Sequence, residues 1–245
     1  MPNKFNYRAI SATLLLLVSL SEPAASAPSV TLCAERPWLS AIMIEQLKKN
    51  TGIAITVQTA PWLRCIYALQ NGQADGAFKA SFKADRLNYS VYPMANGKLD
   101  VDRRMATESY HLYRLKGSRL GWDGKSLNNL DGKIGAQAGF SIVEFLTSLG
   151  AQVDSGAHSA ETNLRMLLRG RFAAVALQTQ EGDSLLNGEF SEIERVEPAL
   201  VEKPYFLVFS RRFFAEHADL ANELWNGVAK VRESPEYMKA MHDNK

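Results

Sequence analysis

The chain has 245 residues and a formal net charge of +2 at pH 7, and 46% of its residues are hydrophobic and 22% are charged. This composition is ordinary for a globular protein and excludes a disordered or fibrous chain. The near-neutral charge argues against nucleic acid as a partner, because such binding needs an excess of Lys and Arg.

The first 27 residues have the pattern of an export signal. Two basic residues precede an apolar run at 9–20 that is too short to span a bilayer, and small residues at 24–27 offer a cleavage site. We therefore predict that residues 1–27 are removed and that a soluble periplasmic protein of about 218 residues remains. Its net charge falls to +1, because the segment carries two basic residues and one acidic residue.

Strand and helix signals alternate along the first part of the mature chain. Strands are expected at 30–34, 53–58 and 74–78, and helices at 40–49 and from Pro61 onward. A proline in a first helical turn loses no hydrogen bond, since that position has no intrahelical acceptor. The alternation predicts parallel strands that are covered by helices on both faces.

Cys33 and Cys65 are the two cysteines of an exported chain. We predict a disulfide between them, because an oxidising compartment favours pairing whenever the Cα atoms lie within about 7 Å. Closing a loop of about 30 residues would stabilise the fold by about 3 to 4 kcal/mol. The alternative is a pair of buried thiols.

A second α/β unit begins near residue 110 and is followed by a return. The expected strands are 111–115, 133–137, 172–177 and 205–210. The expected helices are 141–149, 160–169 and 220–232. The two units share a sequence pattern. Residues 69–81 and 167–179 both contain the end of a helix, a glycine, a buried strand and polar residues after the strand, and Gly72 and Gly170 occupy equivalent positions.

This pattern predicts an α/β protein with two lobes, each a doubly wound sheet with flanking helices. Residues 28–109 form the first part of lobe 1, residues 110–202 form lobe 2, and residues 203–245 return to lobe 1. Two chain crossings between the lobes make a hinge, and the cleft between the lobes is the expected ligand site.

Four sequence motifs, by their order and spacing, make the whole mature chain resemble the family 3 periplasmic solute-binding proteins. They are NGQADGAF at 71–78, the loop Ser81-x-Lys83-x-Asp85-Arg86, LDGKIG at 130–135 followed by Gly139-Phe140-Ser141, and LRGRFA at 168–173. The resemblance implies the type II periplasmic-binding-protein fold. It also implies a receptor that delivers amino acids or similar small polar molecules to an ABC transporter.

Arg86 follows a predicted strand end, where ligands bind in open α/β sheets. It looks like the family's carboxylate-binding arginine, and its guanidinium matches a carboxylate with two parallel hydrogen bonds. Ser81 matches the family's hydroxyl before that arginine. The alternative for Arg86 is a solvated surface side chain.

In lobe 2, Gly139, Phe140 and Ser141 match the family's glycine-plus-polar turn, where backbone amides share the ligand carboxylate with the arginine. Ser141 and Glu144 have the spacing of a capping box, which predicts an anion seat at the helix start. Gln178 stands where amino-acid receptors usually place an aspartate for the ligand ammonium. This departure argues against an ordinary α-amino acid as the ligand.

Trp38 and Trp62 follow the first two strands, where such receptors often place an aromatic wall, although either tryptophan could instead belong to the core. Glu35 is a candidate for a ligand ammonium, and its alternative is a solvent-facing acid. The predicted ligand-binding set is therefore Glu35, Trp38, Trp62, Ser81, Arg86, Gly139, Phe140, Ser141 and Gln178.

These features predict a monomeric, non-enzymatic receptor that uses no cofactor and no metal and has a membrane permease as its partner. His residues are scattered without metal-binding spacing, and no nucleophile motif occurs. An exported enzyme on the same fold, a dehydratase or a cell-wall lyase, is the main alternative, with Glu35 or Glu181 as a lone general acid. A soluble sensor subunit for a membrane signalling protein is another.

Overall fold

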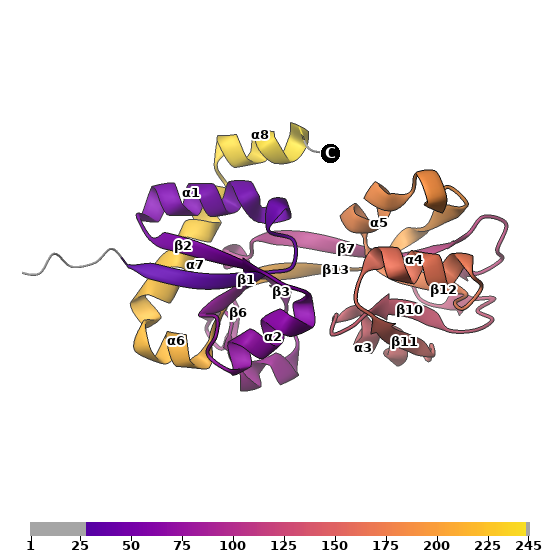
Figure 1. Ribbon diagram of the computed structural model, residues 1–245, viewed down its shortest axis with the longest axis horizontal. Coiled ribbons are helices and arrows are strands. Elements are labelled where there is room, and N and C mark those ends of the chain that lie inside the picture. The colour runs from indigo at the N-terminus through magenta and orange to yellow at the C-terminus, as the bar shows by residue number, and fades with distance from the viewer. Residues whose placement is uncertain (1–27, 244–245) are drawn as a thin grey trace, which may run out of the picture.

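The computed structural model describes residues 28–243, so the predicted export signal at 1–27 lies outside the described residues. Its core is a nine-stranded mixed sheet with helices on its faces (Figure 1). The strands of this sheet are β1 (Ser29–Ala34), β2 (Ala54–Thr59), β3 (Gly76–Ser81), β4 (Ser90–Val91), β7 (Ala106–Leu115), β10 (Ile134–Gln137), β11 (Val153–Ala157), β12 (Ala174–Gln178) and β13 (Ile193–Ser210).

The remaining elements flank this sheet. The α-helices are α1 (Ala41–Thr51), α2 (Trp62–Gln70), α3 (Ile142–Ser148), α4 (Ala160–Leu168), α5 (Thr179–Leu185), α6 (Arg211–Glu216), α7 (Ala218–Arg232) and α8 (Pro235–Asp243). Two short ribbons pair β5 (Met94–Ala95) with β6 (Lys98–Leu99) and β8 (Gly121–Trp122) with β9 (Leu127–Asn128). Short 3-10 turns occur at η1 (Pro37–Ser40), η2 (Ala84–Asn88), η3 (Val101–Arg103) and η4 (Gly188–Phe190).

The strand order is β11-β10-β12-β7-β13-β3-β1-β2. At one end β1, β2 and β3 are parallel, and at the other β10, β11 and β12 are parallel. We call these ends, with their helices, the first half and the second half. The antiparallel strands β7 and β13 run between the halves, as Figure 1 shows, so the two predicted sheets are continuous through the two crossings.

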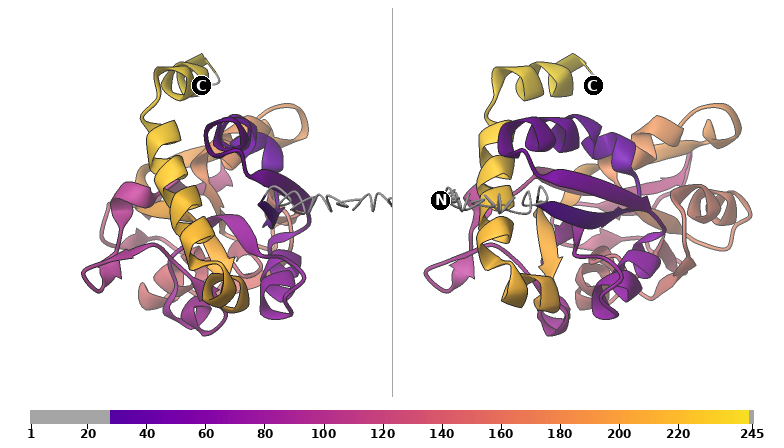
Figure 2. Two further views of the ribbon diagram at one scale, coloured as in Figure 1. Left: turned by 90° about the vertical axis from the view of Figure 1, so that its left-hand side faces the viewer. Right: turned by 60° about the vertical axis from the view of Figure 1, so that its left-hand side comes forward.

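Each half has its own hydrophobic clusters. In the first half, Leu47 of α1 and Leu224 and Val228 of α7 are fully buried against the sheet. Since α7 follows β13, the chain returns to the first half, and Figure 2 shows α7 running along that side of the molecule. In the second half, Ile142 of α3 and Leu164 of α4 are fully buried. The predicted lobe boundaries are compatible with this division and stay a prediction.

The predicted disulfide is confirmed. Cys33 in β1 and Cys65 in α2 are bonded, with their Cα atoms 5.4 Å apart and both side chains buried. The bond ties α2 to the strand whose carboxyl end leads into the cleft. Among residues 28–243, no helix has both the length and the apolar character that crossing a bilayer requires.

Candidate functional site

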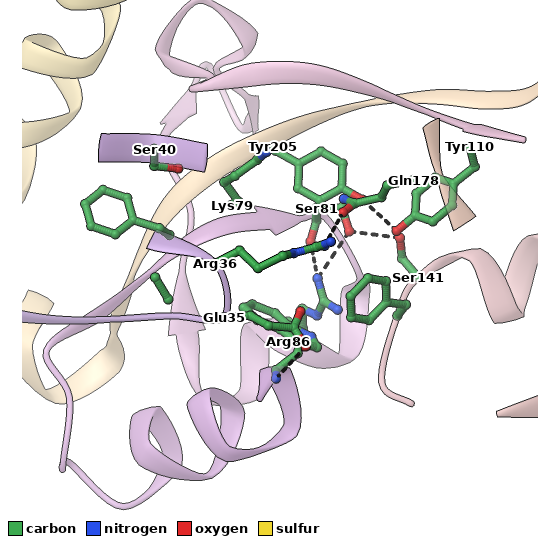
Figure 3. Close-up of a pocket in the computed structure, with 14 residues that line it drawn as sticks. Glu35, Arg36, Ser40, Lys79, Ser81, Arg86, Tyr110, Ser141, Gln178 and Tyr205 are labelled. Carbon is green, nitrogen blue, oxygen red and sulfur yellow. Dashed lines mark hydrogen bonds between the residues drawn. The ribbon is translucent and has the colours of Figure 1, made fainter. Parts of the chain in front are cut away.

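A cavity lies between the halves, at the carboxyl ends of β1, β3 and β12 and against the crossing strands (Figure 3). The space open to the centre of a water molecule is about 50 Å³, so side chains fill most of the cleft. Seven of the nine predicted ligand-binding residues line it: Glu35, Trp62, Ser81, Arg86, Phe140, Ser141 and Gln178. Their role in binding a ligand stays a prediction.

The other two predicted residues are Gly139 and Trp38. Gly139 contributes its carbonyl to the cleft. Its φ is +77°, and a Cβ added there would lie only 2.6 Å from the side chain of Leu63, so the position requires glycine. Trp38 belongs to η1, and its side chain lies outside the described part of the structure.

Arg86 is a buried cation that spans the cleft. It sits in η2, directly after β3, and its side chain is only 3% exposed. Its Nη1 donates to the Ser81 carbonyl at 2.6 Å and its Nη2 donates to the Gly139 carbonyl at 3.0 Å. The guanidinium also lies 5.0 Å from the centre of the Trp62 ring, a cation–π distance. The alternative of a solvated surface arginine is therefore wrong.

The charge environment of Arg86 differs from that of its cationic neighbours. Arg36 pairs with Glu181, and Lys79 pairs with Glu108. The oxygen atoms that accept from Arg86 in the described residues are instead carbonyls and a hydroxyl, which carry no charge. A buried cation without a counter-ion has a high desolvation cost, so this point of the cleft favours an anion.

A chain of hydroxyls links the halves beside Arg86. The Ser81 hydroxyl donates to the Ser141 hydroxyl over 2.8 Å, and the Lys203 ammonium donates to the Ser141 carbonyl at 3.1 Å and to its hydroxyl at 3.2 Å. Burial lowers the pKa of Lys203. Sequence reasoning missed Lys203, because it lies in β13 beyond the segment predicted as strand.

The capping box predicted at Ser141 and Glu144 is wrong. Ser141 has helical dihedral angles, φ −73° and ψ −9°, and its side chain does not cap α3. Its hydroxyl bonds across the cleft instead, while Glu144 pairs with Lys83 at 2.8 Å. The Phe140 amide donates to the Gln137 carbonyl at 3.2 Å, so one of the backbone amides in the turn that the resemblance assigned to the ligand already has an acceptor.

Arg36 is the main residue that sequence reasoning missed. It follows β1 directly, and its side chain reaches into the cleft between Ser81 and Glu35 in Figure 3. Its Nη2 donates to Gln178 Oε1 at 2.9 Å, and its Nη1 forms an ion pair with Glu181. A charged residue at the end of a buried strand was the available signal.

Two buried carboxyl groups lie near this guanidinium. Burial raises the pKa of Glu35 despite Arg36 and the Trp62 amide, which donates to Glu35 Oε1 at 3.4 Å. Burial also raises the pKa of Glu181, and Arg36 opposes that rise. Glu35 is therefore a cleft residue, and its alternative as a solvent-facing acid is wrong.

The crossing strands supply two tyrosines that sequence reasoning also missed. Tyr110 of β7 and Tyr205 of β13 line the cavity, and their hydroxyl oxygens are 2.8 Å apart. Both tyrosines are buried, with exposed fractions of 1% and 3%. No group of three or more His, Cys, Asp or Glu in residues 28–243 is placed to hold a metal ion.

Neither a protein-family model nor a curated protein sequence matches the chain. Solved structures do match. A histidine kinase sensor domain with similarity to periplasmic binding proteins has a TM-score of 0.73 at 12% identity, over 89% of this chain and 96% of that chain. An arginine transport periplasmic binding protein from Legionella pneumophila has a TM-score of 0.72 at 9% identity, over 89% of this chain and 100% of that one.

A third match is the GluR0 ligand-binding core from Nostoc punctiforme in complex with L-glutamate. It has a TM-score of 0.65 at 14% identity, over 86% of this chain and 96% of that chain. At these identities the likeness concerns the fold. The predicted fold class is confirmed, since the chain has the mixed α/β fold of periplasmic binding proteins.

Proposed function

We propose that this protein is a periplasmic receptor that binds a small, carboxylate-bearing solute in the cleft and delivers it to the membrane permease of an ABC transporter. The observation that carries the proposal is Arg86, a buried cation whose acceptors in the described residues are uncharged and come from both halves. A ligand carboxylate would supply the counter-ion that residues 28–243 do not place there.

The same contacts supply a mechanism for closure. Arg86 and Ser81 belong to the first half, whereas Gly139 and Ser141 belong to the second. A ligand held by Arg86 and Ser141 would stabilise the closed arrangement, because it gains both sets of contacts only there. We place the hinge in β7 and β13, the two strands that cross between the predicted lobes.

The matched structures support a small amino-acid-like solute. One of them is the substrate-binding protein of an amino acid ABC transporter, and two others hold a bound amino acid, L-glutamate or L-arginine. The histidine kinase sensor domain favours a second candidate, in which the closed form signals to a membrane protein instead of feeding a permease. Both candidates use the same cleft.

The test is a thermal-shift screen of amino acids and small carboxylates, followed by small-angle scattering with the best compound. A ligand at about 100 times its Kd should stabilise the protein by about 2.7 kcal/mol and should make it more compact. The compound should be recovered unchanged. Its conversion to a product, stopped by Glu35→Gln or Glu181→Gln with binding intact, would establish the enzyme alternative instead.

A further inference from the structure

Inside the cleft, a guanidinium of the protein itself is bound by groups of the opposite half. Arg36 belongs to the turn after β1 in the first half, and its two acceptors, Gln178 and Glu181, belong to β12 and α5 of the second half. The two nitrogen atoms Nη1 and Nη2 each meet one of them. The planar guanidinium therefore has two separate acceptors, one neutral and one charged, both from the opposite half.

These acceptors can accept more hydrogen bonds than Arg36 donates to them. Glu181 pairs with Arg36 through Oε1, whereas its Oε2 is buried and has no hydrogen-bond partner within the described part of the chain. A buried carboxylate oxygen without a donor leaves its desolvation cost uncompensated. The group is therefore suited to a cation that carries further N–H donors.

Glu35 brings a second carboxyl group to the same place. Glu35 lines the same cavity as Arg36, and the Arg36 guanidinium opposes the rise of the Glu35 pKa that burial causes. Glu181 and the Gln178 amide oxygen thus contact the Arg36 guanidinium, and Glu35 adds a second mostly buried carboxyl group to the lining of the same cavity. The side chain of Arg36 is 15% exposed, so it has an opening to solvent through which it can leave.

We propose that Glu181, Gln178 and Glu35 form a seat for a guanidinium or ammonium group of the ligand, and that Arg36 fills this seat until the ligand displaces it. The proposal rests on the receptor function proposed above and narrows the ligand to a molecule with a carboxylate for Arg86 and a cationic group for this seat. Arg36 then acts as an internal competitor that raises the apparent Kd.

This assignment accounts for the glutamine at position 178. An aspartate there would place a third carboxyl group beside Glu35 and Glu181, and like charges in a buried site are unfavourable. Glu181, three residues later, supplies the negative charge instead, from the first turn of α5. The opposite assignment makes Arg36 a second anion-binding group beside Arg86, and it predicts a dicarboxylate ligand.

Calorimetry with three probes separates the two assignments. L-arginine carries both groups, agmatine carries cationic groups without a carboxylate, and glutarate carries two carboxylates. Arg36→Ala should bind L-arginine and agmatine roughly tenfold more tightly than the natural protein, because the competitor is gone. Adding Glu181→Gln should cancel that gain. Arg165→Ala, which removes an arginine from an exposed ion pair with Glu189, is the matched control and should change nothing.

Chemical rescue gives an independent measurement that needs no ligand carboxylate. Methylguanidinium at millimolar concentration should raise the melting temperature of Arg36→Ala by entering the seat, and it should leave the natural protein unchanged. Arg36→Gln, which keeps a polar side chain, serves if the alanine variant folds poorly, and it should show the same rescue.

Two outcomes overturn the proposal. In the first, Arg36→Ala gains no affinity for cationic probes and is not stabilised by methylguanidinium, although a carboxylate ligand still binds the natural protein. The proposed receptor function would then hold without the cation seat. The other is loss of glutarate binding in Arg36→Ala, which makes Arg36 an anion-binding residue. If methylguanidinium rescues the variant while no carboxylate compound binds, the seat stands and the proposed receptor function fails.

Discussion

Replacing Arg86 by alanine should abolish tight binding of a carboxylate ligand. The guanidinium is 3% exposed, so a ligand carboxylate would meet it in a desolvated site. Truncating one partner of such a pair typically costs about 2 to 5 kcal/mol. At about 1.4 kcal/mol for each factor of ten, the Kd should rise by roughly 30-fold to several thousand-fold.

The same change should lower the stability of the fold only modestly. The Ser81 carbonyl keeps the Tyr92 hydroxyl as a donor at 2.7 Å, whereas the Gly139 carbonyl loses Arg86. One unpaired acceptor costs about 1 to 3 kcal/mol, and removal of a buried cation without a carboxylate partner offsets part of that cost. Affinity should therefore fall far more than the free energy of unfolding does.

Isothermal titration calorimetry and urea unfolding of the same preparations measure the two effects. Arg86→Lys is the matched control, because it keeps the charge but loses the fork, and it should bind with intermediate affinity. An unchanged Kd in Arg86→Ala would refute the reasoning. An equal loss of affinity and of folding would show that Arg86 acts only as a structural residue.

Two further predictions concern stability. The double variant Cys33→Ala/Cys65→Ala opens a loop with a sequence separation of 32, so its free energy of unfolding should be lower than that of the natural protein by about 4 kcal/mol. A reductant should destabilise only the natural protein and should therefore remove this difference in stability. Equal urea midpoints for the natural protein and the double variant without reductant would contradict this prediction. Burial raises the pKa of Glu35 above its ordinary value of 4.5, so the folded state binds a proton at a higher pH than the unfolded state does, and stability should rise as the pH falls toward 4.5. Glu35→Gln should raise stability at pH 7 and flatten that rise, and an unchanged pH profile in thermal unfolding would exclude this role for Glu35.

Local patterns were sufficient to predict most elements of the fold. The helix predicted at 160–169 is α4 (Ala160–Leu168), and the strand predicted at 133–137 is β10 (Ile134–Gln137). The length of β13 was missed: the predicted strand covers only 205–210, whereas β13 (Ile193–Ser210) also contains Pro198 and Pro204. Pro198 lies where the register with β7 shifts, and Pro204 has a ladder partner only on the β7 side, so neither removes a required hydrogen bond.

The site was predicted unevenly, for a related reason. Arg86 and Ser81 lie five residues apart beside one strand end, so sequence spacing already placed them together. Ser141 was assigned to its own helix as a cap, since its partner Ser81 is 60 residues away. Arg36 was missed entirely, because its acceptor Gln178 is 142 residues away.

Three features are readable from local sequence: the alternation of strands and helices, the position of Arg86 at a strand end and the candidates for the disulfide. The first two follow from periodicity and from the residues that end each element, which act over a few positions. The polar side chains that bond across the cleft could not be paired in this way. Their pairing depends on how the two halves approach one another, because a buried hydroxyl or guanidinium takes the acceptor that packing places within reach, however distant it is along the chain.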